Sequence, residues 1–175
     1  LHAGPSFENF CAGPNQAALQ HMVLWVGGKG QAQLRSPVPT YLWGPSGSGK
    51  SHLLKATREA LRNEGARVGW LDANVLDAPE FDESWAAVLM DDVHWYNAQQ
   101  QHTAFAWFVA AQTHQRAVLA AGELAPVELK LREDLRTRMG WGHVFSLQPL
   151  TEPERRAVLR QAADARGVFL SDDVM

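Results

Sequence analysis

Short apolar runs alternate along most of the chain with longer segments of helical periodicity. Five of these runs predict β-strands, at residues 40–43, 68–71, 86–90, 117–121 and 143–147. Apolar side chains at helical spacing predict helices over residues 50–63 and 98–114, and the segment around residues 134–139 predicts a short helix. Strands that alternate with helices in this way favour a three-layer α/β/α fold around a five-stranded, mostly parallel sheet.

The last predicted helix has the clearest start signal. Thr151 is followed three residues later by Glu154, which is the spacing of a capping box, and Gly167 predicts the end of the helix. Residues 171–175 then read as the cap and first turn of a further helix. We therefore expect the chain to be part of something longer, with its main domain over residues 1–170.

Composition limits the class of protein. The 175 residues are 46% hydrophobic, which is enough for one domain with a core. The net charge is −3 without long runs of one sign, so extensive binding to a nucleic-acid backbone is not expected. No apolar run is long enough to predict a membrane span. Cys11 is the only cysteine, which favours a reducing compartment and a cytoplasmic location.

A phosphate-binding motif follows the first predicted strand and opens the next helix. It matches G-x-x-x-x-G-K-[ST] and consists of Gly44, Pro45, Ser46, Gly47, Ser48, Gly49, Lys50 and Ser51. Its glycines let backbone N–H groups surround phosphate oxygens, and the start of the helix adds a positive dipole end. Lys50 is expected to reach the β- and γ-phosphates, and the Ser51 hydroxyl to bind Mg²⁺.

Two carboxylates follow the strand at residues 86–90. Ligands bind beyond the carboxyl ends of such strands, so Asp91 is expected to hold Mg²⁺ and Asp92 to orient or deprotonate an attacking water. The histidines at 52, 94 and 102 lack the spacing of metal ligands and are interpreted as surface or packing residues. The tryptophans at 43, 70, 95 and 107 are interpreted as packing residues rather than as a base-stacking platform.

These motifs together resemble the DnaA branch of the AAA+ P-loop ATPases. Residues 6–15 resemble its N-terminal box, which implies that Phe10 holds the adenine of ADP or ATP, and His52 belongs to the matching P-loop segment. Residues 136–142 resemble its box VII, which makes Arg138 the arginine finger. The resemblance implies an AAA+ base domain over residues 1–170 and the start of a helical lid at residues 171–175.

Within this branch the chain is most similar to Hda, the regulatory inactivator of DnaA. The similarity rests on Gly122 at the first sensor position, on the stretch from 142 to 170, and on the short connection from 74 to 85. It implies a negative regulator of replication initiation that stimulates ATP hydrolysis by DnaA through Arg138, with weak hydrolysis of its own. Implied partners are DnaA, a DNA-loaded sliding clamp and a second copy of the chain, with little direct DNA binding.

Two features depart from this pattern, and other functions stay open. Asp92 keeps a second carboxylate that Hda-type proteins often lose, and residues 1–5 do not resemble the clamp-binding peptide of Hda. A DNA-handling ATPase, either an initiator or a helicase loader, is one alternative. An ADP-bound scaffold without hydrolysis is the other. Arg136 is interpreted as part of a solvated helix face, with Glu133 and Asp134 as ion-pair partners.

Overall fold

The computed structural model describes residues 5–10, 12–26 and 37–165. Its strands are β1 (Thr40–Trp43), β2 (Arg67–Leu71), β3 (Trp85–Met90), β4 (Ala117–Gly122) and β5 (His143–Ser146). Its α-helices are α1 (Gln16–Val26), α2 (Lys50–Asn63), α3 (Ala98–Thr113), α4 (Glu133–Met139) and α5 (Glu152–Ala165). Short 3₁₀ turns are η1 (Gly13–Asn15), η2 (Val93–Trp95) and η3 (Pro126–Glu128).

The five strands form one sheet in the order β2-β3-β4-β1-β5, and every pair is parallel. The carboxyl ends of all five strands therefore meet at one edge. The central strands β3 and β4 are almost wholly buried, as expected for a sheet covered on both faces. The predicted parallel sheet is confirmed, and it collects the loops after the strands into one region.

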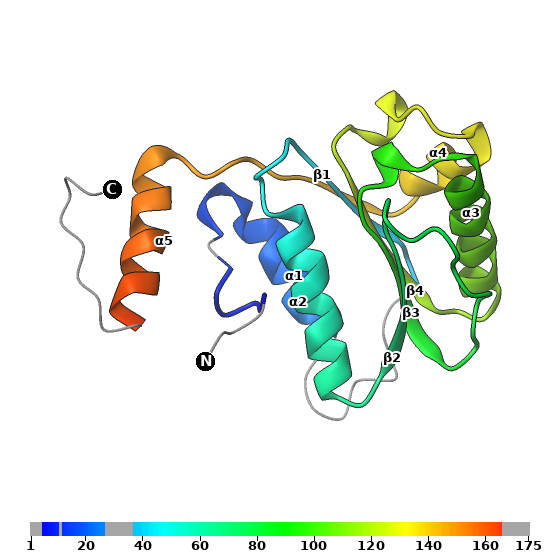
Figure 1. The fold of residues 1–175 in the computed structure, drawn as a ribbon, viewed down its shortest axis with the longest axis horizontal. Helices are drawn as coiled ribbons and strands as arrows, with labels where there is room; N and C mark the ends of the chain where they lie inside the picture. The colour runs from blue at the N-terminus through cyan, green and yellow to red at the C-terminus, as the bar shows by residue number, and fades with distance from the viewer. Residues whose placement is uncertain (1–4, 11, 27–36, 166–175) are drawn as a thin grey trace.

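Helices cover both faces of the sheet and bury two separate cores. In Figure 1, α1 and α2 lie on one side of the sheet, and α3 and α4 lie on the other. One core packs Leu53, Leu54 and Met22 against Leu42 and Leu89. The other core packs α3 and α4 against the opposite side chains of the same strands. The three-layer α/β/α architecture predicted from the sequence is confirmed.

Most predicted elements agree with the structure within two residues, but α1 was missed. Met22, Trp25 and Val26 of α1 are buried, whereas the neighbouring Val23 and Leu24 are exposed, and Leu24 is 80% exposed. These exposed apolar side chains blur the helical periodicity on which the prediction depended. The capping box of α5 is confirmed: Thr151 N–H donates to Glu154 Oε1 at 2.7 Å. The predicted helix end at Gly167 and the predicted lid residues 171–175 lie outside the described residues.

The connection between β2 and β3 contains no helix, as its shortness predicts. Hydrogen bonds from side chains of α3 hold this connection in place. Gln100 Nε2 donates to the carbonyls of Ala73 and Val75 at 2.9 and 3.0 Å, and Trp107 Nε1 donates to Pro79 O at 3.1 Å. None of the helices in the described ranges is long and apolar enough to cross a membrane.

Candidate nucleotide-binding site

The P-loop runs from β1 into α2 and holds its lysine inside the loop. Lys50 is only 7% exposed, and its Nζ donates to Gly44 O at 2.6 Å and to Pro45 O at 2.9 Å. Burial lowers the pKa of Lys50, whereas the carboxylates of Asp91, Glu123 and Asp92 act in the opposite direction. The lysine predicted to contact phosphates therefore lies at the centre of the loop, surrounded by carbonyl oxygens.

Ser51 and Asp91 meet beneath the loop. The Ser51 hydroxyl donates to Asp91 Oδ2 at 2.7 Å, and Asp92 N–H donates to Asp91 Oδ1 at 2.9 Å. Burial raises the pKa of Asp91, and the hydrogen bond from Ser51 opposes that rise. Among the described residues, no three His, Cys, Asp or Glu side chains converge on a metal position. One hydroxyl and one carboxylate still fit Mg²⁺, which takes few protein oxygens and keeps waters and substrate phosphates as its other ligands.

Asp92 adopts a left-handed backbone conformation at the carboxyl end of β3. Its φ of 54° is uncommon for a residue other than glycine and adds local strain. The kink starts η2 and leaves Asp92 beside the P-loop. The predicted water-orienting carboxylate is therefore near the phosphate-binding residues, although β4 lies between β3 and β1 in the sheet.

A cavity of about 440 Å³ lies over the P-loop. Its lining combines residues from the loop, from α2 and from the ends of β3 and β4: Ser46, Gly47, Gly49, Lys50, Ser51, His52, Asp92, His94, Trp95 and Glu123. His94 and Trp95, interpreted from the sequence as surface or packing residues, both line this cavity. Glu123 was not singled out at all, because only the sheet order brings the end of β4 beside the end of β3.

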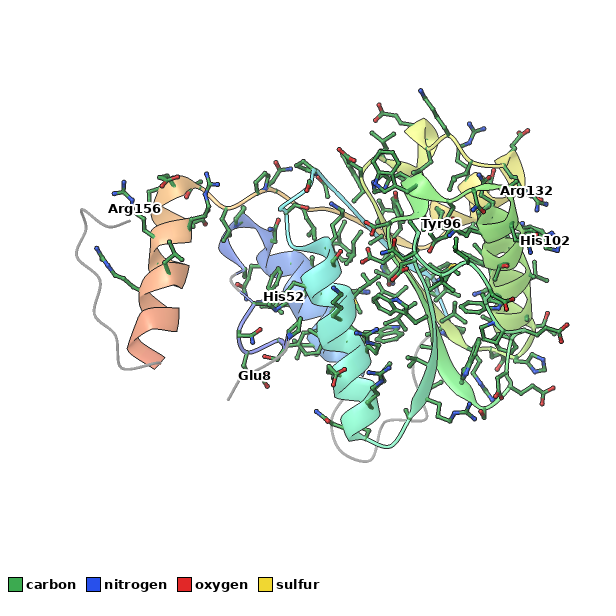
Figure 2. All side chains as sticks on the ribbon, viewed as in Figure 1. Glu8, His52, Tyr96, His102, Arg132 and Arg156 are labelled. Atoms are coloured by element: carbon green, nitrogen blue, oxygen red, sulfur yellow. The ribbon has the colours of Figure 1, made fainter. Side chains whose placement is uncertain are left out.

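Phe10 and His52 form the other end of the site. Their ring centroids are 5.2 Å apart, and His52 Nε2 donates to Ser6 O at 2.8 Å. Gly49 must lack a side chain here, since a Cβ would lie 2.8 Å from Phe10 Cε1. Figure 2 shows His52 on α2, on the side of the N-terminal segment. A hollow of about 150 Å³ borders these residues and has an apolar wall, which fits the predicted adenine position.

Asn15 fastens the N-terminal segment to the P-loop and to the chain after β5. Its amide donates to Gln148 O at 2.8 Å and to Ser48 O at 3.4 Å, and its Oδ1 accepts from Gln148 N–H at 2.8 Å. Asn15 is only 3% exposed, so these bonds are shielded from water. One buried side chain thus keeps three separate segments in register around the site.

Gly122 is the last residue of β4, and its neighbours leave no room for a side chain. A Cβ at this position would lie 2.5 Å from Tyr41 Oη and 2.8 Å from Val93 Cγ2. Tyr41 is itself fixed, because its hydroxyl donates to Leu124 O at 2.6 Å. Packing therefore requires a glycine at position 122, which the sequence resemblance assigned to the first sensor.

Replacing Gly122 with alanine should destabilise the domain by about 1–3 kcal/mol, the usual cost of overfilling a packed core. The free energy of unfolding in urea measures this. The double variant Gly122→Ala/Tyr41→Phe should recover part of the loss, since the closest clashing atom is then absent. A Gly122→Ala variant as stable as the parent would show that Tyr41 and Val93 can move away from the new methyl group without loss of stability.

Arg138 lies on α4 and is held by two aromatic rings. Its guanidinium carbon is 4.8 Å from the centre of the Phe105 ring and 4.7 Å from that of Trp141, and Nη1 donates to Asp134 O at 3.3 Å. Its Nε is buried and has no hydrogen-bond partner among the described residues. Arg138 borders a shallow surface hollow on α4 and is absent from the lining of the P-loop cavity.

The expected ion pairs of α4 differ from the observed ones. The Asp134 carboxylate pairs with Arg132 at 2.8 Å, not with Arg136 or Arg138. Arg132 also lies over the Phe105 ring at 4.9 Å, and Figure 2 shows it near His102, which lies in the first part of α3. Arg136 is half-buried rather than fully solvated. Arg132 precedes the first residue of α4, so charge spacings within the helix do not point to it.

Comparisons with known proteins agree with this geometry. No family model matches the chain. It is 27% identical over 154 residues to the chromosomal replication initiator protein DnaA 2 of Chlamydia caviae. That match covers 78% of this chain and 34% of the initiator, so the chain spans about a third of this relative's length.

Two solved structures have the same fold. Domain III of DnaA from Thermotoga maritima superimposes with a TM-score of 0.78 at 22% identity, covering 99% of this chain and 79% of that one. AMPPCP-bound DnaA from Aquifex aeolicus superimposes with a TM-score of 0.74 at 22% identity, covering 99% and 59%. The P-loop, the parallel sheet and these matches together show that the chain has the AAA+ P-loop NTPase fold of DnaA domain III.

Proposed function

We propose that this chain is a nucleotide-binding AAA+ regulator of replication initiation, which binds ADP or ATP and stimulates ATP hydrolysis by DnaA. The observation that carries the proposal is the separation of Arg138 from the chain's own P-loop cavity. An arginine held at the surface by two rings is suited to another molecule's nucleotide. The finer assignment, to an Hda-like inactivator located in the cytoplasm, rests on the sequence resemblance.

Nucleotide binding is supported by the whole site. Lys50 and the P-loop N–H groups suit the phosphates, and the hollow at Phe10 and His52 suits the base. Ser51 and Asp91 would hold Mg²⁺, which would neutralise charge on the phosphate oxygens. The Aquifex aeolicus DnaA that shares this fold binds the ATP analogue AMPPCP.

The contacts that hold the Arg138 side chain support its proposed role in trans. Its two ring contacts and its bond to the α4 backbone restrict the side chain before any partner arrives, which lowers the entropy cost of positioning it. A guanidinium placed against a transferring phosphoryl group stabilises the charge that develops there. DnaA is the proposed partner. Binding to a sliding clamp and to a second copy of this chain are further proposals, which rest on the sequence resemblance alone.

One observation favours the scaffold alternative. Gly122 places no polar side chain beside the cavity, so a donor to the terminal phosphate is absent at that position. Weak hydrolysis by this chain alone is compatible with strong stimulation of a partner, because the two use different residues. The DNA-handling alternative has less support, since the connection from 72 to 84 is short and rich in carboxylates.

The test makes three measurements with the purified chain. Isothermal titration should show binding of ADP and ATP, and phosphate release by ATP-loaded DnaA should rise when the chain and its nucleotide are added. Gel shifts with single-stranded DNA over a range of salt should show little binding. Tight, salt-sensitive DNA binding without any effect on DnaA would contradict the regulator and favour the DNA-handling ATPase.

A further inference from the structure

His94 and Glu123 form a pair on the wall of the P-loop cavity. Glu123 N–H donates to His94 Nδ1 at 3.0 Å, and His94 Nε2 lies 3.3 Å from Glu123 Oε2. The side chain of His94 is 12% exposed, and that of Glu123 is 44% exposed. The carboxylate is thus open to the cavity, while the imidazole behind it is largely shielded.

The hydrogen bond from Glu123 N–H fixes the state of His94. A backbone N–H can only donate, so Nδ1 must be the unprotonated acceptor and the ring proton lies on Nε2. The Nε2 edge of the ring lies 3.3 Å from the Glu123 carboxylate. His94 therefore holds Glu123 as a neutral ring and does not cancel its charge.

The position of Glu123 along the cavity follows from the rest of the site. Phe10 and His52 mark the base end. Glu123 belongs to the opposite end, with Asp92, where β3 and β4 finish. A nucleotide laid over the P-loop would direct its terminal phosphate towards this end.

The charges at this end are mostly negative. Lys50 faces the carboxylates of Asp91, Asp92 and Glu123, all of which stabilise its ammonium form. Ser51 and Asp91 are assigned to Mg²⁺ and Asp92 to an attacking water, so Glu123 is the carboxylate left without a role. A triphosphate brings about one more negative charge to this end than a diphosphate does near neutral pH.

We propose that Glu123, held in place by His94, makes this site favour a nucleoside diphosphate over the triphosphate. The proposal rests on the proposed nucleotide binding and deepens it by naming the residue that sets the preference. Glu123 disfavours the terminal phosphate by like-charge repulsion, and His94 is a positioning residue that acts through it. For a pair of charges open to solvent, the effect on the affinity ratio is about 3- to 10-fold.

The experiment compares ADP and ATP affinities by titration calorimetry with Mg²⁺ and again with EDTA. Glu123→Gln keeps the size of the side chain and removes its charge, so the ratio of ATP affinity to ADP affinity should rise about 3- to 10-fold. Glu80→Gln removes one charge from the exposed β2–β3 connection and should leave the ratio unchanged. Raising the salt concentration should shrink the difference between parent and Glu123→Gln, because exposed charges are screened.

A second variant tests the role of His94. His94→Phe keeps a ring but removes the hydrogen bond from Glu123 N–H and the Nε2 contact with the carboxylate, so it should shift the ratio in the same direction by a smaller factor. In a Glu123→Gln background the same change should add little, since His94 acts through the carboxylate. Thermal unfolding confirms that each variant folds, and Glu123→Ala, which also removes the charge, replaces Glu123→Gln if that protein does not.

The outcomes separate the two proposals. If the parent chain binds neither nucleotide, the proposed function fails. If the parent binds both but Glu123→Gln leaves the ratio unchanged, only the role of Glu123 is overturned. A ratio that falls in Glu123→Gln would overturn it too, since the carboxylate would then assist triphosphate binding.

Discussion

Replacing Arg138 with alanine should abolish the stimulation of ATP hydrolysis by DnaA, while nucleotide binding by this chain stays within about twofold. An arginine supplied in trans to a phosphoryl-transfer site is worth roughly 10³–10⁵ in rate in well-studied cases. Arg138 does not line the chain's own P-loop cavity, so its loss should spare that site. Phosphate release from DnaA under single-turnover conditions measures the first effect, and calorimetric titration of ADP measures the second.

Arg136→Ala on the same helix is the matched control, and it should retain most of the stimulation. Arg138→Lys keeps a positive charge but loses the planar fork and the stacking on Phe105 and Trp141, so it should restore little activity. Circular dichroism checks that α4 still folds without the packed guanidinium. Full stimulation by Arg138→Ala would remove the arginine finger from the proposal.

Replacing Lys50 with alanine should weaken binding of both ADP and ATP by about 100-fold or more. Each charge-assisted hydrogen bond contributes about 1.5–3 kcal/mol, and about 1.4 kcal/mol corresponds to a tenfold change in affinity. Lys50 is buried in the loop with its Nζ on Gly44 O and Pro45 O, so the ammonium is already held where phosphates would lie. Calorimetric or fluorescence titration measures the change.

Lys130→Ala is the control for a lost positive charge, because Lys130 is exposed and lies outside the cavity lining. The Lys50 variant also leaves two loop carbonyls without their donor, so its unfolding free energy should be measured alongside. Unchanged nucleotide affinity in a folded Lys50→Ala protein would contradict the assignment of the P-loop.

Much of the fold could be predicted from the sequence because its signals are local. The strand–P-loop–helix unit around Lys50 is specified by consecutive residues, and the capping box at Thr151 lies within four residues. Helix α1 was missed for the converse reason. Its burial depends on the sheet face against which Met22 and Trp25 pack. Its apolar Leu24 is exposed, so it interrupts the helical periodicity of the buried side chains.

The same distinction runs through the candidate site. The sequence by itself determined the phosphate loop and the paired carboxylates Asp91 and Asp92, since each motif is contiguous and follows a recognisable strand. Only the tertiary structure decided that His94 and Glu123 meet, because β3 and β4 become neighbours through the sheet order. Periodicity and short motifs describe what lies within a few residues, whereas contacts between strand ends depend on how the whole chain packs.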